Sequence, residues 1–268
     1  QARDLLHRLE AIDERGQATP IGRRMASLGT HPRLAHMIER AAALGLADLA
    51  CDIAGLLSER DPLRAQGMQR DPDLRHRLDV LRGAPAPAGF AVDGRALQQV
   101  RRSSELFARR SSRDDSTRAG AEPQLARDQA TGLLLAFASP DRIGMARAGE
   151  SGRYLLSQGR GAALQGPSAL ARSEFIVAAE VDAGEREAKL YLAAPLERVL
   201  LERHFGSLIT AQDEVAWDAR AGAVIARRVR RLGALVLEER TLRDGIEADT
   251  RAAMLAGIRA LGLDCLPW

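Results

Sequence analysis

Arginine, tyrosine and glycine lie close together in one part of this sequence, in a pattern that suits contact with nucleic acid. Arg153 and Tyr154 precede the run Gly159-Arg160-Gly161. Arginine grips phosphate with paired hydrogen bonds, tyrosine can stack on a base, and glycine lets the backbone approach a phosphate closely. The alternative interpretation is a barrel hairpin that needs glycine in its turns and leaves its arginines in solvent.

The densest basic run of the chain contains Arg227, Arg228, Arg230 and Arg231. On a β-strand, Arg228 and Arg230 would share one face and the other two arginines would lie on the opposite face. The run therefore does not predict a one-sided basic stripe. One interpretation is a contact from Arg228 and Arg230 to phosphate or to a partner. The other is a charged edge strand that blocks aggregation.

Other arginines extend the set of candidates. Arg142 begins the first β-type run after Pro140 and completes the predicted nucleic-acid-binding residues. The pairs Arg101-Arg102 and Arg109-Arg110 flank an expected helix and offer a separate hypothesis of RNA contact. Aromatic residues make up only 3% of the chain, so base stacking is restricted to a few places. We therefore expect a mainly electrostatic grip that tolerates many nucleotide sequences.

The chain lacks the residues of nucleotide hydrolysis. Its only lysine, Lys189, follows Glu187-Ala188 without the glycines of a phosphate-binding loop, and no D-E-A-H run is present. The run Gly149 to Arg153 fails the nucleophile-elbow pattern, because arginine replaces its last glycine. Gly159-Arg160-Gly161 fails the dinucleotide-binding pattern, because Leu164 stands at its last position. No hydrolase or dinucleotide site is predicted.

Two further groups of residues invite a site and have a simpler interpretation. His36 and Glu39 share one helical face, but a di-iron bundle needs a second such pair, and none occurs. Glu59-Arg60-Asp61 ends a helix, and a local salt-bridge cluster or a packing contact with a further domain explains it better than catalysis. Cys51 and Cys265 are far apart and match no metal-ligand spacing.

Length and charge limit the class of protein. The chain has 268 residues and a formal net charge of +3, so we expect two or three domains and a bland overall charge. No run of about 18 apolar residues predicts a membrane span, and the first residues show no signal-peptide pattern. Two unpaired cysteines suit a reducing, cytoplasmic location. The first residues start inside a helical pattern, which suggests part of a longer protein.

Apolar periodicity predicts an α-helical first half followed by a β-rich second half. Thr19 and Pro20 mark the start of one helix, and another follows Pro32. Residues 33–110 are expected to be helical apart from a loop at 83–94, with Asp71 capping a helix over 73–81. Residues 111–123 are expected to be mobile. Further helices are predicted over 124–137, 196–205 and 249–261. Strands are predicted over 142–148, 153–157, 174–182, 188–193, 214–219, 223–232 and 234–239.

The segment from Ala18 to Met37, A-T-P-I-G-R-R-M-A-S-L-G-T-H-P-R-L-A-H-M, resembles the passage from the winged-helix to the ratchet domain in DEAH-box RNA helicases. It departs from the family pattern at Ala18, Ile21 and Gly29. The runs P-D-R-I (140–143), G-R-Y-L-L-S-Q-G-R-G-A (152–162), L-A-A-P-L (192–196), R-R-L-G-A-L-V-L (230–237) and L-P-W (266–268) resemble the C-terminal region of bacterial HrpB-type helicases. In collinear order, these runs cover most of the chain.

This resemblance implies an α+β multidomain fold with four parts. A winged-helix remnant would occupy 1–30, a helical ratchet-like bundle 31–138, a small OB-like β-barrel 139–196, and a C-terminal β-hairpin and helix extension 197–268. By resemblance, ATP and Mg²⁺ would bind the motor domains of the parent helicase, and this chain would hold no cofactor.

The function implied is a non-catalytic accessory region of an ATP-dependent RNA helicase that grips single-stranded RNA, or DNA, together with the motor domains. The near-neutral net charge keeps an alternative open, in which the chain is a protein-interaction module that docks a partner or the motor. A free-standing enzyme is the third interpretation. Salt dependence separates the first two, because only phosphate contacts release counterions.

Overall fold

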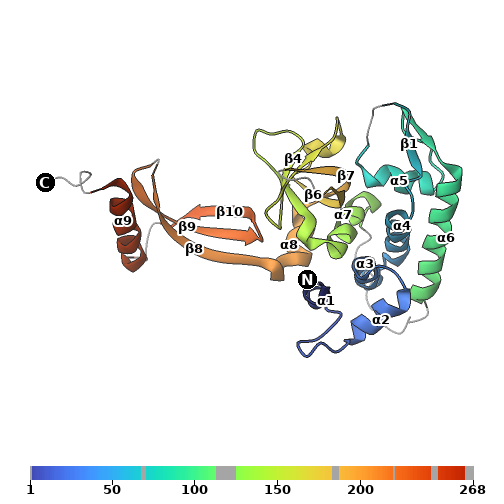
Figure 1. Ribbon diagram of the computed structural model, residues 1–268, viewed down its shortest axis with the longest axis horizontal. Coiled ribbons are helices and arrows are strands. Elements are labelled where there is room, and N and C mark those ends of the chain that lie inside the picture. The colour runs from blue at the N-terminus through green and yellow to red at the C-terminus, as the bar shows by residue number, and fades with distance from the viewer. Residues whose placement is uncertain are drawn as a thin grey trace. The chain divides into compact units, whose positions relative to one another are not determined.

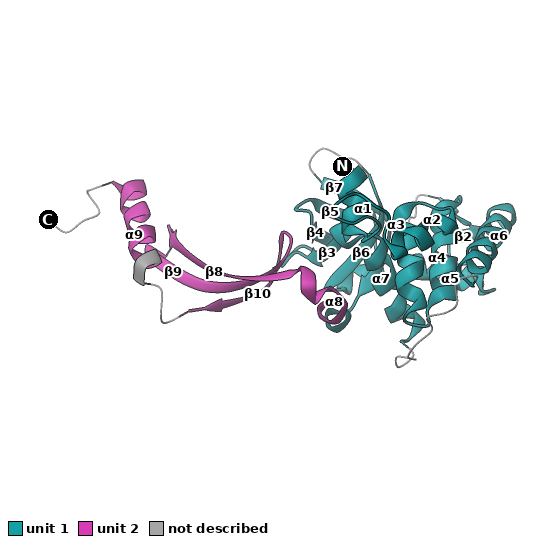
Figure 2. Cartoon of the chain, turned by 90° about the horizontal axis from the view of Figure 1, so that it is seen from below, with its two compact units in different colours: residues 1–201 teal, residues 202–268 magenta. Residues whose placement is uncertain are grey.

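The computed structural model describes residues 2–67, 71–112, 125–182, 187–219, 221–242 and 247–262. The chain divides into two compact units, residues 1–201 and residues 202–268 (Figure 2). The first unit contains a helical bundle and a closed β-barrel, and the second contains a three-stranded sheet and a helix. The fold is therefore mixed α+β, as predicted.

The first helices follow local signals that the sequence carries. Helix α1 spans Ala2–Arg8 and helix α2 spans Pro20–Leu28. The Thr19 hydroxyl accepts a hydrogen bond of 2.9 Å from the backbone N–H of Gly22, as expected for an N-cap. Helix α2 ends at Gly29, which adopts a left-handed conformation with φ of 62°. The predicted capping of this helix is confirmed.

Five further helices form the bundle (Figure 1). They are α3 (Pro32–Ala42), α4 (Ala47–Ser58), α5 (Leu74–Leu81), α6 (Gly94–Ser111) and α7 (Arg127–Ala138). Helices α4 and α6 pack closely, with a hypothetical Cβ on Gly55 only 2.4 Å from the Ser104 Oγ. Helix α7 is buried from Ala130 to Ala138 because it lies between α3 and the barrel strand β7. It joins the bundle to the barrel.

Two details of the bundle differ from the sequence expectations. Residues 33–110 were expected to be helical except for one loop. The structure instead places two short strands there, β1 (Leu63–Ala65) and β2 (Phe90–Val92), which pair antiparallel. The second of these strands lies in the segment expected to be a loop. The cap of α5 is Asp73, which accepts from the Arg75 N–H, whereas Asp71 accepts from the Asp73 N–H one step earlier. Each aspartate can accept from the N–H two residues later, so the sequence alone does not show which of the two caps the helix. The prediction for 111–123 falls largely outside the described residues.

The barrel has five strands in the order β3-β4-β5-β7-β6. The strands are β3 (Ile143–Ala146), β4 (Arg153–Leu156), β5 (Gly161–Leu164), β6 (Phe175–Val181) and β7 (Glu187–Leu196), and 3₁₀ turns η2 (Pro140–Arg142) and η3 (Ala169–Arg172) accompany them. Strands β5 and β7 are parallel, and the other neighbours are antiparallel. Strand β5 was not predicted, because its sequence G-A-A-L has no β-branched residue.

Helix α7 contacts the barrel at Gly132. A Cβ at this position would lie 1.8 Å from the carbonyl oxygen of Pro195 in β7. Glycine is therefore required there to let the helix approach the strand. On the bundle side, the Ala193 N–H of β7 donates to the Pro72 carbonyl at 2.7 Å, next to the start of α5. The barrel and the bundle thus share backbone contacts within the first unit.

The second unit begins in helix α8 (Arg198–Phe205), which spans the boundary, and the turn η4 (Gly206–Leu208). Strands β8 (Ile209–Asp218), β9 (Ala223–Leu232) and β10 (Leu235–Thr241) follow, with β9 in the centre. The hairpin predicted between β8 and β9 is confirmed. The interpretation of 227–231 as an edge strand is wrong, because β10 pairs with its free side. Helix α9 (Glu247–Leu261) packs Gly257 against the Trp217 ring.

Candidate nucleic-acid interface

Arg153 is the first residue of β4 and points out of the barrel. Its side chain is 51% exposed, and its Nη1 lies 3.5 Å from carboxylate oxygens of both Glu150 and Glu187. Ion pairs of this length on an exposed surface are weak, typically below about 1 kcal/mol. The guanidinium is therefore partly neutralised and still accessible to another anion.

Tyr154 does not present its ring to solvent. The side chain is fully buried in the barrel core together with Leu156, Ile176 and Leu190. Its hydroxyl donates to the Leu170 carbonyl at 2.5 Å, and burial raises its pKa to about 12. The expectation that Tyr154 stacks on a base is wrong. Neighbouring residues of a strand face opposite sides, so the exposed Arg153 already implied an inward Tyr154.

The glycines on either side of Arg160 have structural roles at the turn between β4 and β5. Gly159 has φ of 92°, and its N–H donates to the Leu156 carbonyl at 2.7 Å. A Cβ on Gly161 would lie 2.7 Å from Nη2 of Arg147. The space that glycine leaves at position 161 is therefore occupied by a side chain of the same protein. Arg160 itself is half-buried at this turn.

Arg142 is separated from Arg153. Strands β3 and β4 run antiparallel with Ala146 opposite Tyr154, so Arg142 and Arg153 lie near opposite ends of this pair. The Arg142 guanidinium donates to the Ala179 carbonyl at 2.8 Å. Burial, together with the charge of Arg33, lowers the pKa of Arg142 from its ordinary value. The structure therefore does not gather the predicted barrel residues into one site.

The arginines of β9 are all paired with carboxylates of the neighbouring strands. Arg228 binds Asp213 of β8 at 2.7 and 2.8 Å, and Arg230 binds Glu238 of β10 at 3.1 Å. The alternation predicted from the sequence holds, because Arg228 pairs in register with Asp213 and Arg230 with Ala211. These arginines contribute little free positive charge to their face.

The other face of this sheet carries a second ion-pair group. Glu214 accepts from both Arg227, at 3.1 Å, and Arg231, at 2.9 Å, and Arg227 also binds Glu239 at 2.9 Å. Hydrogen bonds from these arginines lower the pKa of Glu214 from its ordinary value. Val229 lies between them and is fully buried. Ion pairs therefore cover both faces of the central strand.

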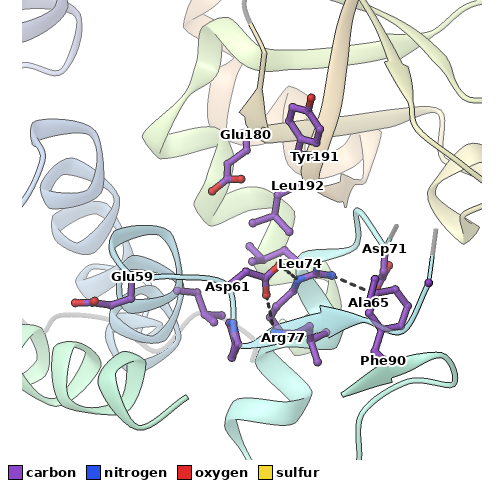
Figure 3. Close-up of a pocket in the computed structure, with 14 residues that line it drawn as sticks. Glu59, Asp61, Ala65, Asp71, Leu74, Arg77, Phe90, Glu180, Tyr191 and Leu192 are labelled. Atoms are coloured by element: carbon purple, nitrogen blue, oxygen red, sulfur yellow. Dashed lines mark hydrogen bonds and ion pairs between the residues drawn. The ribbon is translucent and has the colours of Figure 1, made fainter. Parts of the chain in front are cut away.

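A cavity of about 600 Å³ lies where the bundle meets the barrel within the first unit (Figure 3). The buried Arg77 binds Asp61 at 2.9 Å and Asp71 at 3.1 Å on the bundle side. Glu180 extends from the barrel side in the same view. Carboxylates outnumber the single guanidinium in this lining, so the cavity does not suit phosphate.

The local cluster expected at Glu59-Arg60-Asp61 does not form as such. Asp61 pairs with Arg77 of α5, and Glu59 accepts from the Ser103 hydroxyl at 2.6 Å. Both partners are distant in sequence, so spacing gave no indication of them. These contacts hold α5 and α6 to the end of α4, which the sequence did not predict.

The histidine-containing pair on α3 is also structural. His36 Nδ1 lies 2.8 Å from the Phe137 carbonyl of α7, and Glu39 binds Arg24 of α2 at 2.6 Å. Burial lowers the pKa of His36. Within the described ranges, no three His, Cys, Asp or Glu side chains are grouped to hold a metal ion.

Family models match two segments of the chain, and a relative of known name matches its whole length. Residues 2–29 match the winged-helix model of the helicase associated domain (HA2), and residues 208–242 match the connector region of the ATP-dependent RNA helicase HrpB. The ATP-dependent RNA helicase HrpB of Escherichia coli K12 is 33% identical over all of this chain. The chain corresponds to the C-terminal region of an HrpB-type helicase. The recognised resemblance is thereby confirmed.

Solved structures agree with this assignment. A crystal structure of the E. coli DExH-box NTPase HrpB matches all of this chain with a TM-score of 0.69 and 30% identity. A second, of the E. coli DEAH/RHA helicase HrpB, matches with a TM-score of 0.67 and 30% identity. The chain spans 29% of the HrpB-type sequence and 30% of each solved chain. The similarity to the C-terminal part of such a helicase supports the interpretation of this chain as an accessory region of a helicase.

Among the residues that the structure describes, no helix combines the length and hydropathy needed to cross a bilayer. Helix α6 carries several arginines, including the pairs Arg101-Arg102 and Arg109-Arg110. The sequence hypothesis included these pairs but missed Arg95 on the same helix.

Proposed function

We propose that this chain is an accessory region that grips single-stranded RNA while the motor domains of the parent ATP-dependent RNA helicase hydrolyse ATP with Mg²⁺. The observation that carries the proposal is the similarity of the entire chain to an ATP-dependent RNA helicase. The chain supplies binding surfaces, and the ATPase chemistry belongs to the motor. A cytoplasmic location is part of the same proposal.

The barrel architecture supports an OB-like assignment. Its five strands close into a small barrel whose core is filled by side chains, which is typical of OB folds that bind oligonucleotides. The proposed parts remain a winged-helix remnant over 1–30, a ratchet-like bundle over 31–138, the barrel over 139–196 and the extension over 197–268.

Arg153 and Arg160 are the proposed barrel contacts to phosphate. Arg153 is exposed, and its two carboxylate partners lie at 3.5 Å, a distance at which a phosphate can compete for the guanidinium. Arg142, Arg228 and Arg230 stay in the proposal as secondary contacts, and their guanidinium groups donate to oxygen atoms at 2.8, 2.7 and 3.1 Å.

The test is fluorescence anisotropy of a labelled single-stranded RNA with the full chain, titrated from low to physiological salt. We expect the logarithm of affinity to fall linearly with the logarithm of salt concentration, because phosphate contacts release counterions. The double variant Arg153→Gln, Arg160→Gln should bind more weakly, and Arg228→Gln should change affinity less. Absence of binding at low salt would contradict the proposal.

A docking function is the second candidate, and one observation favours it. Helix α9 exposes Met254, Leu255 and Leu261, each more than half exposed, in the second unit. Exposed apolar side chains grouped on one helix suit a protein interface. We infer that the partner would be the motor domains of the same helicase. A pull-down with those domains that persists at 500 mM salt, and is lost on Leu255→Glu, would support this function.

A further inference from the structure

Helix α6 carries more positive charge than the chain as a whole. Its 18 residues contain five arginines and one glutamate, a net charge of +4, whereas the whole chain has a net charge of +3. The helix runs along the outer side of the bundle, next to α4 (Figure 1). Strand β9 carries the same formal charge, but its arginines are paired with carboxylates of the neighbouring strands.

Two of these arginines hold the bundle together. Arg110 donates to the Leu28 carbonyl at the end of α2, at 2.7 Å, and Arg101 donates to the Leu81 carbonyl at the end of α5, at 3.1 Å. Arginine at the last carbonyls of a helix satisfies acceptors that have no partner within the helix. Arg101 and Arg110 thus have structural roles.

The other three arginines form a stripe. Arg95, Arg102 and Arg109 are spaced by seven residues, which places them on nearly one face and roughly 10 Å apart along the axis. All three are exposed. In the described parts of the chain, Arg95 and Arg102 form no ion pair, and Arg109 has only Glu105 at 3.7 Å, with both side chains largely exposed. These guanidinium groups differ from those of β9, which carboxylates neutralise.

The opposite face of α6 fixes the direction of the stripe. Ala96, Val100, Ser104 and Phe107 are buried, and α6 meets α4 closely at Gly55. Helix rotation is therefore prevented by packing, and the arginine stripe faces away from the bundle core. Gln98 and Gln99 are exposed between Arg95 and Arg102. Their amides can donate to phosphate or ribose oxygens without reading bases.

We propose that the exposed face of α6, defined by Arg95, Arg102 and Arg109, binds the phosphate backbone of the single-stranded RNA. The proposal rests on the proposed function and adds a contact surface outside the barrel. The partner chemistry follows from charge complementarity, since a row of unpaired guanidinium groups suits a row of phosphates. The shortage of aromatic side chains indicates that this contact does not depend on nucleotide sequence.

The experiment compares three proteins, all made as the full chain: the unmodified sequence, the triple variant Arg95→Gln, Arg102→Gln, Arg109→Gln, and a control, Arg24→Gln, Arg227→Gln, Arg231→Gln. The control removes the same charge from carboxylate-paired arginines. Anisotropy with a labelled 12-nucleotide oligouridine is measured at several salt concentrations, and thermal unfolding by circular dichroism verifies the fold of each variant.

We expect the α6 variant to lose about tenfold or more in affinity at low salt, and its salt slope to become shallower by about 2, the loss of three phosphate contacts on a single strand. The control should lose less. Equal affinity of the α6 variant and the unmodified chain would overturn the α6 proposal without contradicting RNA binding by the chain. If the unmodified chain binds no RNA at low salt, both the proposed function and the α6 proposal that rests on it are overturned.

Discussion

Arg33 and Asp141 form a two-point ion pair between the bundle and the barrel. Nη1 and Nη2 of Arg33 donate to the two carboxylate oxygens at 2.6 and 3.0 Å, and Nη1 also donates to the Ala138 carbonyl at 3.0 Å. The pair links α3 to the turn η2, across the end of α7. Both side chains are about four-fifths buried. The pair therefore ties the start of the barrel to the bundle.

Removing one partner of this pair should destabilise the first unit. Arg33→Met would leave the Asp141 carboxylate partly buried without its counter-charge, at a cost of about 2 kcal/mol in the free energy of unfolding. Urea unfolding followed by circular dichroism measures this loss. The exposed pair Arg109–Glu105 supplies a control, and Arg109→Met should change stability by less than about 0.5 kcal/mol. Equal effects of the two substitutions would contradict the structural role of Arg33.

The same pair predicts how stability depends on acid. Burial raises the pKa of Asp141, but the hydrogen bond and charge of Arg33 outweigh it and hold the pKa below its ordinary value of 3.8. A carboxyl with a lowered pKa stabilises the fold above its unfolded pKa and loses this contribution as pH falls through its folded pKa. Stability should therefore decline below about pH 4, and the decline should be smaller in Asp141→Asn. An identical acid profile for both proteins would refute this assignment.

Gly132 should tolerate no side chain. A Cβ there would lie 1.8 Å from the Pro195 carbonyl oxygen, so Gly132→Ala must push α7 away from β7. We expect a loss of about 1–3 kcal/mol in unfolding free energy, measured as a lower melting temperature. Gly94→Ala is the matched control, because nothing lies within 4 Å of a Cβ at that position. Unchanged melting of Gly132→Ala would show that the helix and strand are further apart.

Tyr154 should matter for stability and not for RNA. Tyr154→Phe removes the hydroxyl that donates to the Leu170 carbonyl, leaving a buried acceptor without this partner, at a cost of about 1–2 kcal/mol. The melting temperature should fall while RNA affinity of the folded protein stays the same. A large loss of RNA affinity with unchanged melting would restore the stacking role that burial excludes.

The ion pairs of the β8–β10 sheet should make its protection from solvent exchange depend on pH and salt. Hydrogen bonds from arginine lower the pKa of Asp213, Glu214 and Glu238. Their stabilisation is therefore present above the ordinary carboxyl pKa and is lost as pH falls through the lowered values. Hydrogen exchange measured by mass spectrometry should show faster exchange of β9 in Glu214→Gln, and the difference should shrink at high salt. Glu150→Gln, in the barrel, should leave β9 unchanged.

Local signals in the sequence determined several elements of this protein by themselves. The capped start of α2 at Thr19 and Pro20, its end at Gly29, and the β8–β9 hairpin were predicted because capping and turn formation depend on neighbouring residues. The resemblance to HrpB-type helicases was also readable from collinear motifs. These features need no knowledge of distant contacts.

Tertiary structure alone decided which residues remain available at the surface. Strand β5 exists because Gly161–Leu164 pairs with β4 and with β7, and β9 is central because β10 returns beside it. The charge of Arg228 is balanced by Asp213, fifteen residues earlier, whereas Arg102 meets no carboxylate in the described chain. Ion pairing depends on strand register and helix rotation, and both are set by packing between segments that are distant in sequence.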